Sequence, residues 1–249
     1  MKTNKIALAV IATLFAGTVS ASSIDYRHEY KAGRQQHQNR VKLSTSVQAW
    51  KFASEVKFGG SKIDGEYPSA FKNLAMTSSE LTIEHKTKLT KHLYIQPGFD
   101  LTLNPTSVVY KPQVRVGYKF PMGITTKLRY RHEFRRYTEG SSMTGIDGDK
   151  YTAVNRSKFT ANVTYKFKFG LGFDLESNFA QDFFNNTWAM GSTKRGQNVH
   201  YEWDYNVLAY YRPQGWNFQP YFELGNIQAS SPSNDKRELR TRVGLKYNF

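Results

Sequence analysis

The alternation of polar and apolar residues is clearest between Lys127 and Arg136. In a β-strand, successive side chains point to opposite faces of the sheet. One face of this segment would then be charged and the other apolar. The charged face comprises Lys127, Arg129, Arg131, Glu133 and Arg135, and the apolar face comprises Leu128, Tyr130, His132 and Phe134. A helix, at about 3.6 residues per turn, would scatter these arginines around its whole surface, so the segment is predicted to be a strand.

The same alternation recurs along the chain and predicts about twelve strands. They span residues 23–31, 39–47, 52–58, 79–89, 93–103, 110–120, 127–136, 154–167, 171–182, 198–212, 216–225 and 236–249. We expect long connections after the odd-numbered strands and short turns after the even-numbered ones. Bacterial outer-membrane barrels have this arrangement, with long extracellular loops and short periplasmic turns, so both termini would be periplasmic.

The predicted fold class is all-β, a transmembrane antiparallel up-and-down β-barrel. No segment approaches the run of about 18 apolar residues that a spanning helix needs, and no helices are predicted that could cover the apolar faces. A sheet in which strand after strand has one apolar and one charged face closes most simply with lipid outside and charge in the lumen. The last residue, Phe249, has an outward register, as is common for the final strand of such barrels.

The N-terminus is predicted to be a signal peptide comprising residues 1–21. Lys2 and Lys5 form a basic start, Ile6–Ala16 is apolar but too short to span a membrane, and Val19–Ala21 has the small residues of a cleavage site. An uncleaved anchor is the alternative, which the short apolar run disfavours. Export combined with amphipathic strands points to the outer membrane of a Gram-negative bacterium.

The composition agrees with a barrel formed by residues 22–249. The mean hydropathy of −0.61 is low for a membrane protein, but only alternate residues of each strand need to be apolar. The 16 tyrosines and 17 phenylalanines suit the aromatic girdles of such barrels. There is no cysteine, which excludes disulfides and thiolate metal sites, and no cofactor is expected.

The formal net charge of +15, or +13 after removal of Lys2 and Lys5, favours an anionic partner. Nucleic acid is not expected, because the basic residues alternate within strands instead of forming an exposed run.

In a ring of twelve strands, two groups of inward basic residues would face each other across the lumen. The basic track of the first, second and last strands contains Arg27, Lys31, Arg40, Lys42, Arg240, Arg242 and Lys246. The basic track of the sixth to eighth strands contains Lys111, Arg115, Lys119, Lys127, Arg129, Arg131, Arg135, Arg156, Lys158 and Lys166. Most acids of the strands between them are Asp174, Glu176, Glu202, Asp204 and Glu223.

Basic tracks of this kind favour the passage of anionic solutes. Rings of Arg and Lys select anions in pores, and a guanidinium binds a carboxylate through two hydrogen bonds. A solute with a carboxylate on every unit would therefore fit best. The alternative is an inert lumen in which the charges only pair with one another, as in barrels of about eight strands.

Six segments resemble the oligogalacturonate-specific porins of enterobacteria (KdgM type). They are Ser23–Glu29, Ser54–Lys57, Pro97–Phe99, Leu128–Arg131, Pro220–Asn226 and Arg240–Phe249. The resemblance implies a monomeric twelve-stranded channel for acidic oligosaccharides from pectin breakdown, with two arginine tracks. The basic residues in matching segments are Arg27, Arg40, Lys111, Arg115, Arg129, Arg131, Arg135, Arg240 and Arg242. A relative in the same family passes sialic acid, and the long loops of this chain do not match clearly, so another acidic sugar is the alternative solute.

The sequence gives less support to three other interpretations: an enzyme, a surface receptor or adhesin, and a calcium site. An outer-membrane enzyme needs a nucleophile, a histidine and an orienting group in register, but His28, His85 and His132 would face lipid. A surface receptor or adhesin would leave the basic lumen without a role. Asp147 and Asp149 lie in a glycine-containing loop and raise the question of calcium, although such a pair more often makes an ordinary turn, so no metal site is predicted.

Overall fold

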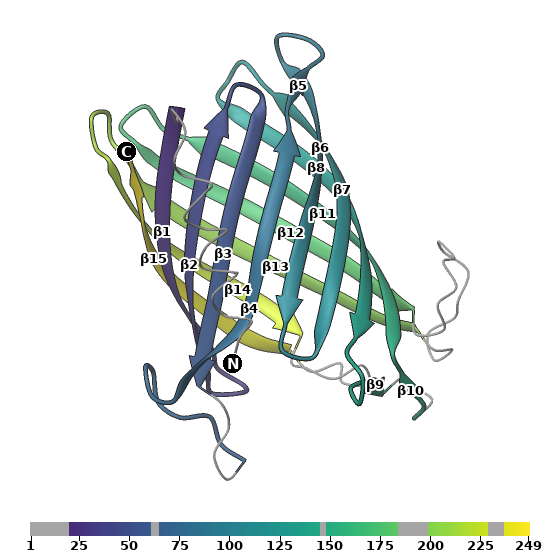
Figure 1. Cartoon of the computed structure of the whole chain (residues 1–249). Coiled ribbons are helices and arrows are strands. Elements are labelled where there is room, and N and C mark those ends of the chain that lie inside the picture. The colour runs from purple at the N-terminus through teal and green to yellow at the C-terminus, as the bar shows by residue number, and fades with distance from the viewer. Residues whose placement is uncertain (1–19, 61–64, 145–147, 184–198, 229–236) are drawn as a thin grey trace.

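The computed structural model describes residues 20–60, 65–144, 148–183, 199–228 and 237–249. These residues form a closed antiparallel β-barrel, confirming the predicted fold class (Figure 1). The predicted signal peptide lies almost wholly outside the described residues, so its removal stays a prediction. No helix in the described ranges is long and apolar enough to cross a membrane.

Twelve strands make up the barrel wall, one of them interrupted. They are β1 (Ser20–Lys31), β2 (Gln36–Val47), β3 (Trp50–Gly60), β4 (Leu74–His85) with its continuation β5 (Thr87–Lys88), β6 (Leu93–Asn104), β7 (Ser107–Lys119), β8 (Ile124–Tyr137), β11 (Ala153–Lys166), β12 (Leu171–Phe183), β13 (Val199–Tyr211), β14 (Phe218–Gln228) and β15 (Arg237–Asn248). Two short strands, β9 (Met143–Thr144) and β10 (Lys150–Tyr151), form a separate hairpin between β8 and β11.

The barrel closes between its first and last strands. Residues 23–31 of β1 pair with residues 240–248 of β15 in a continuous antiparallel register. Each of the other wall strands pairs with its neighbours in the sequence, and β6 pairs with both β4 and β5 across the break at Lys86. All strand edges are therefore hydrogen-bonded, as a barrel in lipid requires.

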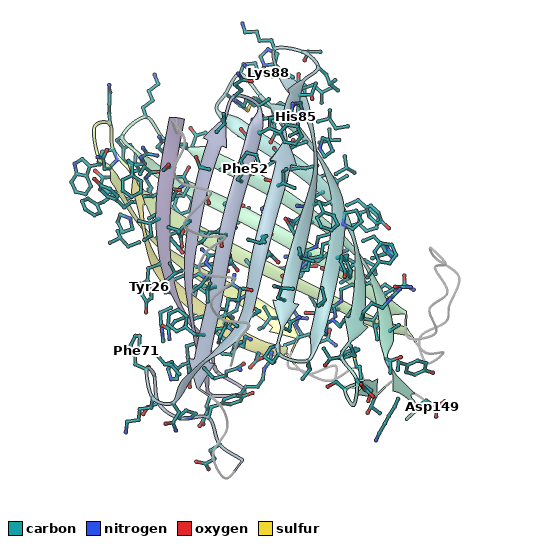
Figure 2. All side chains as sticks on the ribbon, in the orientation of Figure 1. Tyr26, Phe52, Phe71, His85, Lys88 and Asp149 are labelled. Carbon is teal, nitrogen blue, oxygen red and sulfur yellow. The ribbon has the colours of Figure 1, made fainter. Side chains whose placement is uncertain are left out.

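The register turns apolar side chains outward and polar side chains into the lumen. Large apolar side chains such as Leu128, Val207 and Val243 are exposed on the outer surface, whereas Glu29 and Glu55 are buried inside the barrel. Figure 2 shows the side chains on both sides of the wall. The inward and outward faces predicted from the sequence are thus confirmed for the described strands.

Aromatic side chains pack in pairs on the outer surface at one end of the barrel. Figure 1 shows that the C-terminus lies at this end. Trp50 packs edge-on against His85 with ring centroids 4.6 Å apart, and Tyr247 packs edge-on against Phe249 at 5.0 Å. We call this end, which carries the connections after β2, β5, β7, β11 and β13, the turn end, and the opposite end the loop end. By the convention of outer-membrane barrels, the turn end is periplasmic.

Two of the connections predicted to be long are short. Only residues 32–35 join β1 to β2, and only Pro105 and Thr106 join β6 to β7. The prediction of a long first connection was wrong because it counted the polar residues 36–38 as loop, whereas Gln36 and Gln38 pair with β1. Polar composition does not mark a loop where a strand continues beyond the lipid.

Three tyrosines in the lumen lie flat over glycines of the adjacent strand. Tyr94 is paired with Gly117, Tyr210 with Gly172, and Tyr221 with Gly244. A Cβ atom at any of these glycines would overlap the tyrosine ring. Because glycine leaves room for the ring against the wall, the aromatic side chain does not project into the lumen.

We expect Gly172→Ala to lower both the conductance and the free energy of unfolding. The new methyl group would push the Tyr210 ring into the lumen, and overpacking of this kind costs about 1–3 kcal/mol. Single-channel recording and urea titration in detergent micelles would measure the two effects. The double variant Gly172→Ala/Tyr210→Ser should restore the conductance, and an unaltered conductance in the single variant would contradict the packing argument.

Candidate functional site

The lumen is the candidate functional site, because the register directs all of the predicted track residues into it. The ring order places β15, β1 and β2 on one side of the barrel and β7, β8 and β11 on the opposite side. The two groups of basic residues therefore lie on facing walls. Most of these cations, however, have carboxylate partners that the sequence analysis did not assign.

On the first wall, two arginines of β15 share one acid. Arg242 Nε lies 2.5 Å from Glu29 Oε2 and its Nη1 lies 2.6 Å from Glu223 Oε1. Arg240 Nη2 contacts the same Glu223 oxygen at 3.3 Å. Because Glu29 is on β1 and Glu223 on β14, these contacts join three strands across the seam of the barrel.

The β2 cations on this wall are also paired. Arg40 Nη2 contacts Asp25 Oδ1 at 2.6 Å, and its Nη1 lies 3.4 Å from Glu55 Oε2. Lys42 Nζ lies 3.6 Å from the same Glu55 oxygen. Each side chain keeps some exposure to the lumen, 14% for Arg40 and 26% for Lys42, so both can still meet a solute.

On the second wall, most of the acids come from the neighbouring strands β4 and β6, and Glu133 comes from β8 itself. Lys111 Nζ lies 2.7 Å from Glu80 Oε2, and Arg115 Nη1 lies 3.2 Å from Glu84 Oε1. Arg131 contacts Glu133 at 2.5 Å and Asp100 at 3.7 Å. These acids hold the cations of β7 and β8 in fixed positions.

Toward the two ends of this wall, further pairs continue the pattern. Near the loop end, Arg156 makes two hydrogen bonds to Asp182, at 2.5 and 2.8 Å, and one to Glu202 at 3.0 Å. Toward the turn end, Lys127 Nζ lies 3.6 Å from Asp174 Oδ2.

Seven of the predicted track residues have no carboxylate within 4.0 Å in the described part of the chain. They are Arg27, Lys119, Arg129, Arg135, Lys158, Lys166 and Lys246. Within the described ranges, Arg129 donates only to Thr160 Oγ1 at 3.1 Å and Gln113 Oε1 at 3.4 Å, and its Nε has no partner. Arg27 Nε is likewise buried without a partner.

Arg27 and Arg129 occupy equivalent places on the two walls. Each lies near the middle of its strand, and each is directly paired across strands with another arginine, Arg27 with Arg40 and Arg129 with Arg115. Like charges directly opposite each other in a sheet repel. An anion bound between the two arginines of either cross-strand pair would relieve that repulsion.

The acidic wall between the tracks contains an amide network that the sequence analysis missed. Asn178 and Asn206 both donate to Glu176 Oε1 and to Asp204 Oδ1, at 2.8–3.2 Å. Arg240 donates to Asn206 Oδ1 at 2.5 Å, which links this network to the first wall. The only sequence pattern that could have indicated it is the inward register shared by these asparagines and acids.

The histidines give no support to an enzyme. His132 Nδ1 lies 3.2 Å from Ser157 Oγ on the outer surface, but both side chains are buried and Tyr130 contacts both of them. No group of three or more potential metal ligands occurs among the residues that the structure describes. Asp147, one of the two acids considered as calcium ligands, lies outside the described residues.

Comparison with known families decides what kind of barrel this is. The family model described as "Oligogalacturonate-specific porin protein (KdgM)" matches residues 15–249. The chain belongs to this porin family. Members of the KdgM porin family are outer-membrane channels, so the expectations of an outer-membrane channel and of no enzymatic activity are confirmed.

Two curated proteins are similar to this chain. The oligogalacturonate-specific porin KdgM of Dickeya dadantii is 29% identical over 255 residues, covering 100% of both chains. The N-acetylneuraminic acid outer membrane channel protein NanC of Escherichia coli is 22% identical over 167 residues, 66% of this chain and 67% of the relative.

Solved KdgM-family structures share the fold. The NanC porin aligns with a TM-score of 0.68 at 16% identity, covering 90% of this chain and 98% of that one. The KdgM porin in complex with disordered oligogalacturonate aligns with a TM-score of 0.60 at 23% identity, covering 91% and 99%. At these identities, the likeness supports the architecture of the barrel.

Proposed function

We propose that the protein is a monomeric porin for the uptake of acidic oligosaccharides, most simply oligogalacturonates, through a lumen lined by two facing basic tracks. The apolar outer belt would contact outer-membrane lipid, and the first 21 residues would be removed on export. The observation that carries the proposal is a pair of arginines on opposite walls, Arg27 and Arg129, that have no carboxylate within 4.0 Å among the described residues.

The arrangement suits a solute that has carboxylates at regular intervals. Guanidinium groups bind carboxylates through two parallel hydrogen bonds and keep their charge at any physiological pH. Wall carboxylates compensate most of the other cations, so no single site would hold the solute strongly. A chain of uronates could then pass from one arginine to the next.

Sialic acid is the second candidate solute, favoured by the likeness to NanC. The oligogalacturonate channel of Dickeya dadantii matches the full length of this chain, whereas the sialic acid channel matches 66% of it. This difference favours oligogalacturonates over sialic acid as the solute.

The test is single-channel recording of the refolded mature protein in a planar bilayer under a KCl gradient. We expect an anion-selective current that trigalacturonate blocks. An anion-selective current that responds to sialic acid and not to trigalacturonate would keep the porin and change the solute. A correctly folded barrel that carries no current would contradict the proposal and bring the adhesin back into consideration.

A further inference from the structure

Several lysines that face the lumen lie together at the turn end of the barrel. Among them, Lys86, Lys88 and Lys119 have no carboxylate within 4.0 Å among the described residues. At the loop end, Lys31, Arg34 and Arg156 lie in ion pairs with Glu29, Glu238 and Asp182, although Arg135 has no such partner within the described ranges. The turn end therefore carries a group of uncompensated lysines.

The turn-end lysines belong to one continuous row of the sheet. Lys88 is paired with Tyr94, Tyr94 with Gly117, and Gly117 with Lys127, so all four positions share the lumen face. Since Gly117 has no side chain, the Tyr94 ring lies over it and forms a floor between the two lysines. Figure 2 shows Lys88 in the hairpin that projects beyond the barrel wall at this end.

Two more lysines complete the group. Lys86 Nζ lies 4.0 Å above the centroid of the Tyr94 ring. Lys119 is exposed at the end of β7, two positions from Gly117 on the same face. We call Lys86, Lys88, Lys119 and Lys127 the lysine vestibule.

The lysine vestibule stores electrostatic repulsion. Lys86 is half-buried, and the other three members of the group carry the same positive charge. Within the group, only Lys127 has a nearby acid, Asp174 at 3.6 Å. A carboxylate placed among these ammonium groups would be attracted by all of them.

We propose that the lysine vestibule is an exit subsite for the carboxylate groups of a solute leaving the arginine tracks toward the periplasm. This assignment rests on the proposed function for its solute, a chain of uronates. The tracks are rich in arginine, whereas the vestibule contains only lysine. Lysine suits release of the solute, because an ammonium is a strongly hydrated point charge and lacks the planar fork that holds a carboxylate at two points. The same group would attract anions that approach the channel from the turn end.

The experiment measures blocking rates from each side of the membrane separately. The chain contains no cysteine, so Lys91→Cys in the exposed turn before β6 gives one thiol whose labelling by an impermeant reagent reports which side the turn end faces. Two probes are added to one side at a time: trigalacturonate and tricarballylate, a tricarboxylate that is not a sugar. The test variant is Lys86→Gln/Lys88→Gln/Lys119→Gln. The control Lys72→Gln/Lys150→Gln/Lys168→Gln removes the same charge from exposed connections.

In the test variant, we expect the association rate of both probes from the turn end to fall about tenfold at low salt, the scale of electrostatic steering. The rate from the loop end should change much less, and the control should behave as the unmodified protein. Equal changes from both sides, or no change from the turn end, would overturn the exit subsite. If tricarballylate shows the expected asymmetry while trigalacturonate never blocks, the exit subsite stands and the proposed solute fails.

Discussion

Replacing Arg27 and Arg129 together by glutamine should lower the anion-over-cation permeability ratio about tenfold, which corresponds to about 1.4 kcal/mol of lost stabilisation of the permeating anion. These guanidinium groups have no carboxylate partner in the described part of the chain, so their charge is available to the solute. Block by trigalacturonate should weaken in parallel. Reversal potentials under a KCl gradient give the permeability ratio directly.

The matched control is Lys91→Gln/Lys168→Gln, which removes two positive charges from exposed turns outside the lumen. It should leave the reversal potential close to that of the unmodified protein. A reversal potential that shifts equally in both double variants would show that overall charge, and not the two arginines, sets selectivity. Glutamine keeps the polar character of the side chain, and each replacement removes a like-charge contact, so folding should be preserved.

The second large effect concerns stability. We expect Arg242→Ala to lower the free energy of unfolding by about 3 kcal/mol, because two buried carboxylates each lose a cation and keep only the longer contacts to Lys31 and Arg240. Glu29 and Glu223, the two partners, are 3% and 8% exposed. Both lie within 2.6 Å of the guanidinium, and they belong to strands on either side of β15. Urea titration in detergent micelles measures the loss.

Arg129→Gln is the matched control, since it removes an arginine from the same lumen without leaving a carboxylate unpaired. Its cost should not exceed about 1 kcal/mol, the scale of a lost neutral hydrogen bond. The double variant Arg242→Ala/Glu29→Gln should recover part of the stability, because it removes one of the two carboxylates that lose a cation in Arg242→Ala. Similar losses for Arg242→Ala and Arg129→Gln would argue that the wall carboxylates are well hydrated despite their burial.

The architecture could be predicted from the sequence because a barrel in lipid imposes a period of two on its strands. The segment 127–136 alone fixes which side chains face inward, and the structure places Arg129 and Leu128 on the predicted sides. The ends of the strands are harder to predict from the sequence. The polar residues 36–38 predict a loop, yet they pair with β1, because the strand continues beyond the apolar layer.

The pairing of the lumen charges could not be predicted in the same way. Register shows that Glu84 and Arg115 both face inward, but their contact crosses from β4 to β7, with β6 between them. Such contacts depend on how far each side chain reaches over the curved wall. For the same reason, the sequence could place Arg27 and Arg129 in the lumen but could not distinguish them from the compensated cations beside them.

The wall carboxylates have a kinetic consequence for transport. A uronate that reaches Arg40 or Arg242 meets a guanidinium already engaged by Asp25 or Glu29. It can be accepted only as the resident acid is partly displaced, so each step onto a paired cation would be an exchange of one carboxylate for another. Because an exchange leaves the number of charge-assisted hydrogen bonds nearly constant, the free-energy profile along the axis should be shallow. The channel would then combine selectivity for carboxylates with rapid turnover, and its occupancy should saturate only at high solute concentration.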